Sequence, residues 1–331
     1  MEYQNLGKTD IKVSRICLGC WAFGGDRFWG PQEDSESIRT VHAALDAGIN
    51  FFDTAEVYSE GRSEEILGKA LSGLRDKVII GTKVSPQHLS RKELIKSCEQ
   101  SLRRLKTDCI DVYHIHFANP HIPVDETLSC MEDLKKQGKI RVIGVSNFGR
   151  RDLQEVLKYG RVEVNQLPYN LLWRAIEYEI IPVCIENNIS ITCYSPLAQG
   201  LLTGKFHSPD EVPDGRARTR HFSGKRPLAR HGEKGAEDET FSTIEEIRKI
   251  SEQTNIPMIY LALGWLLSKK EVSCVIVGAR NPDQLHQNIK AIDVKLSPDI
   301  VDRLTNITEK LKQKLGPNAD MWESQLKSRI H

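Results

Sequence analysis

The sequence predicts an α/β fold, a (β/α)8 TIM barrel with an N-terminal β-hairpin and a long loop after the seventh strand. Apolar runs of strand length alternate with amphipathic stretches of helix length, a pattern typical of βα units on a parallel sheet. Eight such strands are present, the number that closes this type of barrel. The 331 residues are close to a barrel of about 250 residues with insertions, so we expect residues 1–331 to form a single domain.

The elements are predicted in order along the chain. The eight strands cover residues 14–19, 50–53, 77–83, 111–116, 141–146, 162–166, 190–195 and 272–278. Helices are expected between them, for example at residues 35–47, 91–105, 124–137 and 176–187. A hairpin over residues 3–13 precedes the barrel.

One connection is much longer than the few residues of an ordinary βα loop. It runs from Ala198 to about Glu239, and long ordered loops are usually functional. Its stretch from Arg216 to Arg230 is basic and shows little hydrophobic periodicity. Two interpretations remain open for this stretch, a solvated charge run and a phosphate clamp over a cofactor.

Charge and hydropathy restrict the partners of the chain. Lys plus Arg number 46 and Asp plus Glu 45, so no overall field recruits nucleic acid or an anionic membrane. The opening residues MEYQNLGKTD lack an apolar signal core, and no stretch approaches the ~18 apolar residues of a membrane span. We therefore expect a cytoplasmic protein that binds small molecules; the charge does not distinguish a monomer from a homo-oligomer.

The cysteines are predicted to be reduced core residues. The chain has 8 of them, scattered mostly within apolar runs and without the repeated spacings of a disulfide scaffold. Cys17 and Cys20 have the spacing of a redox pair or of half a zinc site, but no second pair completes four ligands. Buried, inert thiols are the simpler interpretation.

Candidate catalytic residues lie at successive strand ends, where the chemistry of a TIM barrel is found. Asp53 ends the second strand, Tyr58 follows, Lys83 ends the third and His116 ends the fourth. We expect Lys83 to favour the Tyr58 phenolate and depress the tyrosine pKa below its usual ~10, which makes Tyr58 a proton donor. Asp53 then keeps Lys83 charged, and His116 directs a hydrogen bond at a carbonyl oxygen. Singly, each could cap a helix or pack in the core, but together they indicate an active site.

A metal site is the alternative for the fourth strand. His114 and His116 are two residues apart and should share a face, as in a metal-binding His-x-His pair. No further His or carboxylate cluster follows at later strand ends, so we predict no metal.

Aromatic residues are expected around the mouth of the barrel. Trp21, Phe28 and Trp29 follow the first strand, and Phe117 follows the fourth. Such walls suit an aldehyde, a ketone or the apolar face of a sugar, although ordinary loop packing would also explain Phe28 and Trp29. No cluster of cations near them argues for a phosphorylated or carboxylated substrate.

Several motifs resemble signatures of the aldo-keto reductase superfamily, and the resemblance extends over essentially the whole chain. They are FDTAEVY at residues 52–58, GRSE at 61–64, IIGTK at 79–83, DVYHIHF at 111–117 and KIRVIGVSNF at 139–148. The chain is most similar to the bacterial branch of inositol-operon and stress-associated reductases, and also to potassium-channel β subunits. The match selects His116, not His114, as the catalytic histidine.

The resemblance implies a nicotinamide dinucleotide bound without a Rossmann glycine motif. It places Ser146, Asn147 and Gln166 on the carboxamide and Tyr194 against the nicotinamide ring. Lys205 and Arg216 are implied at the pyrophosphate, under the loop that begins at Ser195. The full implied cofactor set is Cys20, Trp21, Asp53, Ser146, Asn147, Gln166, Tyr194, Ser195, Pro196, Leu197, Gln199, Gly200, Leu202, Lys205, Arg216, Gly278, Arg280, Gln284, Gln287 and Asn288.

NADP is the expected cofactor, with NAD still possible. Arg280 is the candidate for the 2′-phosphate, because its fork can pair with phosphate bidentately. Gln284 stands where some branches carry a further cation, and Arg280 could instead lie over adenine. The expected reaction is reversible reduction of an aldehyde, ketone or sugar carbonyl, including an aldose or an inositol-derived ketone. A cofactor-binding regulatory subunit and a metal-dependent barrel hydrolase are the alternatives from other classes.

Overall fold

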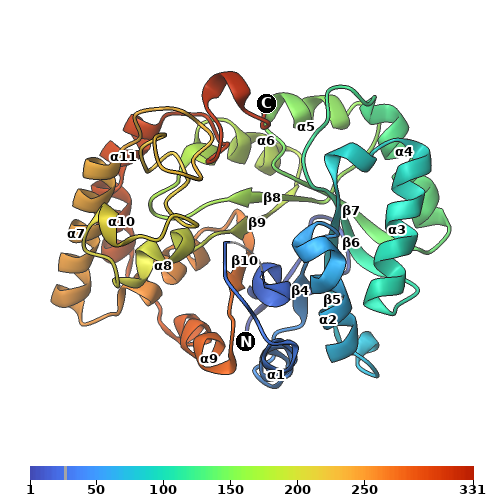
Figure 1. Ribbon diagram of the computed structural model, residues 1–331, viewed down its shortest axis with the longest axis horizontal. Coiled ribbons are helices and arrows are strands. Elements are labelled where there is room, and N and C mark those ends of the chain that lie inside the picture. The colour runs from blue at the N-terminus through green and yellow to red at the C-terminus, as the bar shows by residue number, and fades with distance from the viewer. Residues whose placement is uncertain (26–27) are drawn as a thin grey trace.

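The computed structural model describes residues 1–25 and 28–331 and shows a closed parallel barrel surrounded by helices (Figure 1). The barrel strands are hydrogen-bonded in the order β10-β3-β4-β5-β6-β7-β8-β9, and β1 and β2 form a separate antiparallel hairpin. This confirms the predicted (β/α)8 barrel with an N-terminal hairpin.

The bounds of the elements are as follows. The strands are β1 (Tyr3–Asn5), β2 (Lys12–Ser14), β3 (Ile16–Gly19), β4 (Phe51–Asp53), β5 (Ile79–Val84), β6 (Ile110–Ile115), β7 (Ile140–Ser146), β8 (Val164–Pro168), β9 (Ser190–Tyr194) and β10 (Val272–Gly278). The α-helices are α1 (Asp34–Asp46), α2 (Arg62–Ala70), α3 (Arg91–Leu105), α4 (Val124–Lys136), α5 (Arg150–Val156), α6 (Ile180–Glu186), α7 (Glu237–Thr254), α8 (Met258–Leu267), α9 (Pro282–Ile289), α10 (Pro298–Ile307) and α11 (Glu309–Leu315). Short 3₁₀ turns cover Trp21–Gly24, Tyr58–Gly61, Arg75–Lys77, Pro86–His88, Ala175–Glu177, Ala198–Thr203, Pro209–Glu211, Lys290–Asp293 and Gln325–Lys327.

The strands divide the core into two clusters of buried side chains. One fills the barrel interior with residues from several strands, such as Phe51 of β4, Val112 of β6 and Val164 of β8, and it includes Leu6 and Val13 of the hairpin. The hairpin thus closes the amino-terminal end of the barrel. The other, larger cluster lies between the strands and the surrounding helices. Side chains therefore fill the barrel, and the carboxyl ends of the strands are left to carry the site.

Among the predicted helices, the one over residues 176–187 differs most from the structure. The structure has a 3₁₀ turn at Ala175–Glu177 and then α6 from Ile180 to Glu186. Pro182 has no N–H to donate, so it is tolerated only in the first turn of a helix. Beginning α6 at Ile180 places Pro182 in that first turn.

The predicted long connection after β9 is confirmed. It contacts the C-terminal segment, residues 316–331. Between β9 and α7 it contains only the two 3₁₀ turns at Ala198–Thr203 and Pro209–Glu211. The Arg220 N–H donates to the Met321 carbonyl at 2.9 Å, and Trp173 Nε1 after β8 donates to the Ala319 carbonyl at 3.3 Å. The C-terminal segment then ends beside α5, as Figure 1 shows. In the described chain, no helix has both the length and the apolar character needed to cross a membrane.

Candidate active site

The structure brings the four predicted catalytic residues together at the carboxyl end of the barrel. Lys83, within β5, donates from Nζ to Asp53 Oδ1 at 2.6 Å, to the Thr54 carbonyl at 2.7 Å and to the Tyr58 hydroxyl at 3.3 Å. The His116 ring, just after β6, meets the Tyr58 ring edge-on with centroids 5.9 Å apart. Neighbouring parallel strands therefore deliver an acid, a cation, its counter-charge and an imidazole to one point.

Lys83 is a completely buried ammonium that stays charged. Burial alone would lower the pKa of its ammonium group, but the Asp53 carboxylate and the Tyr58 oxygen outweigh burial and raise it. The other oxygen of Asp53 accepts from Gln166 Nε2 at 2.8 Å, so both carboxylate oxygens are hydrogen-bonded. The predicted role of Asp53 as the counter-charge of Lys83 agrees with this geometry.

The expected direction of the Tyr58 pKa shift is wrong. The charge of Lys83 and its hydrogen bond do lower the pKa of the phenol, as expected, but burial raises it by more. The resulting pKa lies above the usual value, not below it. Tyr58 is therefore a protonated phenol at neutral pH, which is the form that can donate a proton.

The two histidines of the β6 region lie in different surroundings. His114 is fully buried, its Nδ1 lies 3.4 Å from the Thr82 carbonyl oxygen, and burial lowers its pKa to about 4. A Cβ on Gly144 would lie 2.6 Å from the His114 ring, so the ring fills the space that this glycine leaves. His116 is only partly buried and faces Tyr58. Among the residues that the structure describes, no group of three His, Cys, Asp or Glu side chains could hold a metal ion.

The residues implied for the nicotinamide end form one hydrogen-bonded group on β7, β8 and β9. The Tyr194 hydroxyl donates to Asn147 Oδ1 at 2.9 Å, and Ser146 Oγ donates to the Gln166 carbonyl at 3.0 Å. Asn147 Nδ2 donates to Ser146 Oγ at 3.0 Å and to the His116 carbonyl at 3.1 Å. This group is thereby fixed against the catalytic residues. Cys20 and Trp21 lie on the other side of Asp53, where the Cys20 N–H donates to the Asp53 carbonyl at 2.8 Å.

The loop after β9 carries the residues implied for the pyrophosphate. Gln199 and Gly200 have positive φ, and a Cβ on Gly200 would lie 3.3 Å from Lys205 Nζ and 3.7 Å from Arg216 Nη1. Burial and the neighbouring Arg216 lower the pKa of Lys205. In the described ion pairs neither cation has a carboxylate partner, and the buried Gln199 Nε2 has no hydrogen-bond acceptor. Ser195, Pro196, Leu197 and Leu202 belong to the same loop.

Arg280 lies at the start of the β10–α9 turn, but its guanidinium already has protein partners. It donates to Gln32 Oε1 and to the Trp29 carbonyl, both at 2.9 Å, and to the Pro31 carbonyl. These contacts occupy three of its five N–H groups and leave two for a phosphate. Burial and the positive charge of Arg280 lower the pKa of Arg216, so the two cations are close enough to repel each other.

The other residues implied for the adenosine end vary in exposure. Gln284 is exposed and accepts the Arg280 N–H at 3.0 Å, and Gln287 is exposed on α9. Asn288 is buried and donates to the carbonyl of Gly278 at 3.3 Å, so it holds α9 to the end of β10.

All four aromatic residues predicted at the mouth lie there. Trp21 stacks on Tyr58 at 5.9 Å, and it meets Phe28 and Trp29 edge-on at 6.3 and 5.4 Å. Phe117 stacks on His116 at 5.5 Å. The rings therefore flank the acid and the imidazole from two sides.

Arginine side chains pack against several of these rings. The Arg218 guanidinium lies 4.1 Å from the centroid of Phe28 and 4.2 Å from that of Trp322. The guanidinium of Arg329 lies 4.2 Å from the centroid of Phe117. Sequence reasoning missed Trp322 and Arg329 because they follow the last helix and no strand-end rule locates them. The basic stretch was the only signal for Arg218.

The basic stretch is also not a solvated charge run. Arg218 and Arg220 are buried, and Arg220 pairs with Glu233 at 2.8 Å and donates to carbonyls of Leu315 and Asn318. Arg226 pairs with Glu237 at 2.9 Å. Most charges of the basic stretch therefore hold the loop to neighbouring segments. Arg216 instead lies beside Gly200, with Lys205, where the pyrophosphate is implied.

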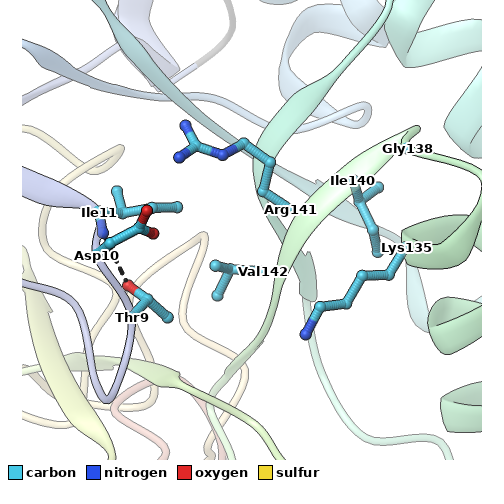
Figure 2. A pocket seen from close by; sticks show the side chains of 8 residues that line it. All are labelled: Thr9, Asp10, Ile11, Lys135, Gly138, Ile140, Arg141 and Val142. Atoms are coloured by element: carbon cyan, nitrogen blue, oxygen red, sulfur yellow. Dashed lines mark hydrogen bonds between the residues drawn. The ribbon is translucent and has the colours of Figure 1, made fainter.

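A cavity of about 470 Å³ lies at the opposite end of the barrel, away from these residues. Its lining includes Asp10 of the hairpin turn, Lys135 near the end of α4 and Arg141 near the start of β7 (Figure 2). Arg141 is already paired with Asp111 at 2.8 Å. The amino-terminal end of a TIM barrel contributes stability rather than catalysis, so we do not place the chemistry there.

Known proteins resemble the chain over nearly its full length. It is 36% identical to the aldo-keto reductase YhdN of Bacillus subtilis over 86% of this chain and 87% of that protein. It is 33% identical to the NADH-specific methylglyoxal reductase of Escherichia coli, over 93% and 98% of the two chains. A probable voltage-gated potassium channel subunit beta of Oryza sativa is 31% identical, over 93% and 97%.

Solved structures and a family profile agree with these relatives. The glycerol dehydrogenase AKR11B4 from Gluconobacter oxydans is 30% identical with a TM-score of 0.79, and the match covers 96% of each chain. An aldo/keto reductase from Klebsiella pneumoniae in complex with NADP and acetate is 30% identical with a TM-score of 0.71, covering 97% of this chain and 95% of that one. The profile of the Aldo/keto reductase family matches residues 15–309. The chain therefore belongs to the aldo/keto reductase family.

Proposed function

We propose that the chain is an NADP-dependent oxidoreductase that reduces an aldehyde, ketone or sugar carbonyl to the alcohol, with Tyr58 as the proton donor. The observation that carries this proposal is the buried Lys83 ammonium, which contacts both Asp53 and the Tyr58 hydroxyl. His116 lies against the same hydroxyl-bearing ring. This arrangement can protonate an oxygen and stabilise the charge that develops during the transfer.

Each of the four residues has its own role in the proposed reaction. His116 donates a hydrogen bond to the carbonyl oxygen and orients it toward Tyr58. The Tyr58 O–H bond breaks as its proton moves to that oxygen, and Lys83 stabilises the developing phenolate. Asp53 keeps Lys83 charged and in place. When bound, the reduced nicotinamide supplies the hydride that the carbonyl carbon accepts.

The chain offers a suitable set of groups for a dinucleotide. Ser146, Asn147, Gln166 and Tyr194 would hold the nicotinamide end. Lys205 and Arg216 have no carboxylate partner in the described ion pairs, and the Gln199 amide is buried without an acceptor, so these groups fit a pyrophosphate. Arg280 would bind the 2′-phosphate with its two remaining N–H groups. NADP in the Klebsiella pneumoniae relative supports this choice, while the NADH-specific relative keeps NAD as the alternative.

The substrate is proposed to be a small carbonyl compound that enters between the aromatic walls. Names of relatives point to methylglyoxal and to glycerol, which are both small and oxygen-rich. We keep an aldose or an inositol-derived ketone as candidates, because Trp21 and Phe117 can also cover the apolar face of a ring. We place the enzyme in the cytoplasm, which its buried free thiols suit.

The first prediction tests the reaction class. Purified protein should oxidise NADPH in the presence of 4-nitrobenzaldehyde, and the rate should not change after EDTA treatment, because every proposed role belongs to a side chain or to the dinucleotide. NADPH absorbance at 340 nm measures the rate. A rate that disappears with EDTA and returns with zinc would replace this mechanism by a metal-dependent one. Tight NADPH binding without turnover on a panel of aldehydes and sugars would instead favour a regulatory subunit.

A further inference from the structure

The C-terminal segment, residues 316–331, brings a cation to the His116 side of the site. The Arg329 guanidinium lies 4.2 Å from the centroid of the Phe117 ring. That ring stacks on the His116 imidazole, with centroids 5.5 Å apart and planes inclined by 26°. The imidazole in turn meets Tyr58 edge-on. Arg329, Phe117, His116 and Tyr58 thus form one continuous chain of contacts.

The position of Arg329 is fixed by a buried carboxylate. Its Nε and Nη2 donate to the two oxygens of Asp320 at 2.8 and 2.9 Å, and its backbone N–H donates to the same group at 3.2 Å. Asp320 is fully buried and also accepts the Trp322 N–H at 3.0 Å. Bidentate pairing of this kind sets the plane of a guanidinium as well as its location.

The segment that carries this ion pair is anchored on both sides. Before the pair, Arg220 Nη1 donates to the Asn318 carbonyl at 3.2 Å. After it, the His331 N–H donates to Asp152 Oδ2 at 2.7 Å, and the Asp152 N–H donates to the His331 carbonyl at 3.0 Å. Arg329 is therefore held over Phe117 from the long loop and from α5.

His116 needs such support because its ring has little else to orient it. Within the described residues its backbone carbonyl accepts from Asn147, but no hydrogen bond to its ring nitrogens is present. The plane of the imidazole then depends on its contacts with the Tyr58 and Phe117 rings. A donor that acts on a carbonyl must be held within roughly 10–20° of the productive orientation.

We propose that Arg329 is a positioning residue, which holds the Phe117 ring against His116 and so sets the direction of the His116 hydrogen bond. This inference rests on the proposed role of His116. Cation–π contact between Arg329 and Phe117 supplies the attraction, and Asp320 supplies the geometry. A segment distant in sequence from the barrel strands is thereby part of the catalytic machinery.

The same arrangement affects the charge of the imidazole. The titratable and charged groups around His116 are Lys83 from β5, His114 from β6, Tyr58 from the turn after β4 and Arg329 from the C-terminal segment. Burial lowers the pKa of His116 well below its usual value, and the charges of Lys83, His114 and Arg329 lower it further. Removing Arg329 should therefore raise the His116 pKa toward the ordinary value.

The kinetic test compares variants of the contact chain. Arg329→Gln should lower kcat/KM by about ten- to hundredfold, the cost expected of a misplaced catalytic group, with NADPH affinity unchanged. Phe117→Leu removes the ring but leaves the Arg329–Asp320 pair, and it should show the same defect in a folded protein. Arg329→Lys keeps the cation without the bidentate fork and should fall between the wild type and Arg329→Gln.

The matched control is Arg230→Gln. Arg230 also ties the C-terminal segment, through Glu323 at 3.2 Å, but it is half exposed and contacts neither Phe117 nor His116. It should leave kcat/KM and NADPH affinity unchanged. A ¹⁵N-histidine NMR titration, with His116 assigned by His116→Asn, should show a raised His116 pKa in Arg329→Gln and no change in Arg230→Gln.

Two results would overturn the inference. One is a kcat/KM for Arg329→Gln or Phe117→Leu that equals that of the wild type. The other is an equal loss in Arg230→Gln, which would show that the segment acts only through general stability. The titration needs no turnover, so it separates this inference from the proposed function. If the wild type is inactive toward carbonyls but Arg329→Gln still raises the His116 pKa, the proposed function is rejected and the contact between Arg329 and the His116 surroundings is confirmed.

Discussion

Tyr58 is subject to two opposing effects, and their balance defines its chemistry. Burial raises the pKa of the phenol, while Lys83 lowers it through its charge and its 3.3 Å hydrogen bond. Burial dominates, so Tyr58 holds its proton at neutral pH and is ready to act as an acid. Lys83 contributes during the transfer itself, because an ammonium at this distance stabilises the charge that appears on the oxygen as the proton leaves.

Replacing Tyr58 by Phe separates this chemistry from binding. The change removes only the hydroxyl and keeps the ring that contacts Trp21 and His116. We expect kcat to fall by the ~10²–10⁴-fold typical of a lost general acid, with nearly unchanged NADPH affinity by protein fluorescence. Lys83→Met should show a similar loss, and the double variant should be little worse than either, because the two residues act as a unit.

This expectation has a clear counter-result. If Tyr58→Phe turns over several aldehydes at a near-normal rate, and a deuteride isotope effect shows that hydride transfer limits that rate, the proton comes from another group. His116 is then the next candidate. Circular dichroism of Lys83→Met is the necessary check on folding, because this change leaves the buried Asp53 carboxylate without its cation.

At the scale of elements, the strands were predictable and the segments over their carboxyl ends were not. Asp53, Lys83 and His116 could be placed because the carboxyl ends of parallel strands all meet at one end of the barrel. Arg218, Trp322 and Arg329 lie on a long loop and a C-terminal segment, whose paths follow from tertiary contacts such as Arg220 with Asn318. The sign of the Tyr58 pKa shift depends on how far tertiary packing buries the phenol, which the position of Tyr58 in the sequence does not show, so the predicted direction was wrong.

The β10–α9 turn allows a test of cofactor choice. Arg280→Ala should raise the apparent Michaelis constant for NADPH much more than the apparent Michaelis constant for NADH. A lost charge-assisted contact is worth on the order of 1.5–3 kcal/mol, or roughly ten- to hundredfold. Initial rates with each cofactor, at a fixed concentration of 4-nitrobenzaldehyde, measure the two constants.

The control for this variant follows from the contacts of Arg280. The guanidinium also holds the Trp29 and Pro31 carbonyls and the Gln32 side chain, so alanine loosens residues 29–32 as well. Gln32→Ala removes one of these contacts and keeps the charge, and it should change the two constants equally. If Arg280→Ala raises the apparent Michaelis constants for NADPH and NADH by the same factor, Arg280 does not bind the 2′-phosphate.

At the scale of the whole molecule, the proposed cofactor site joins distant parts of the chain. Its residues run from Cys20 after β3 to Asn288 on α9, and the loop after β9 lies between them in sequence. A ligand that contacts all of these elements binds only when the barrel is closed and the long loop is in place. Binding must therefore stabilise the entire fold and not one part of it.

The last prediction uses this linkage to test both the cofactor and the proposed single domain at residues 1–331. NADPH at 100 times its dissociation constant should stabilise the folded state by about 2.7 kcal/mol, which for a chain of this length moves the unfolding midpoint by about 4 °C. Differential scanning calorimetry should show one transition that moves as a whole. Tyr58→Phe should give the same shift, because the hydroxyl acts in catalysis and not in binding. Two transitions of which NADPH moves only one would divide the chain into separate domains. An unmoved midpoint at saturating NADPH would remove the dinucleotide from the proposal altogether.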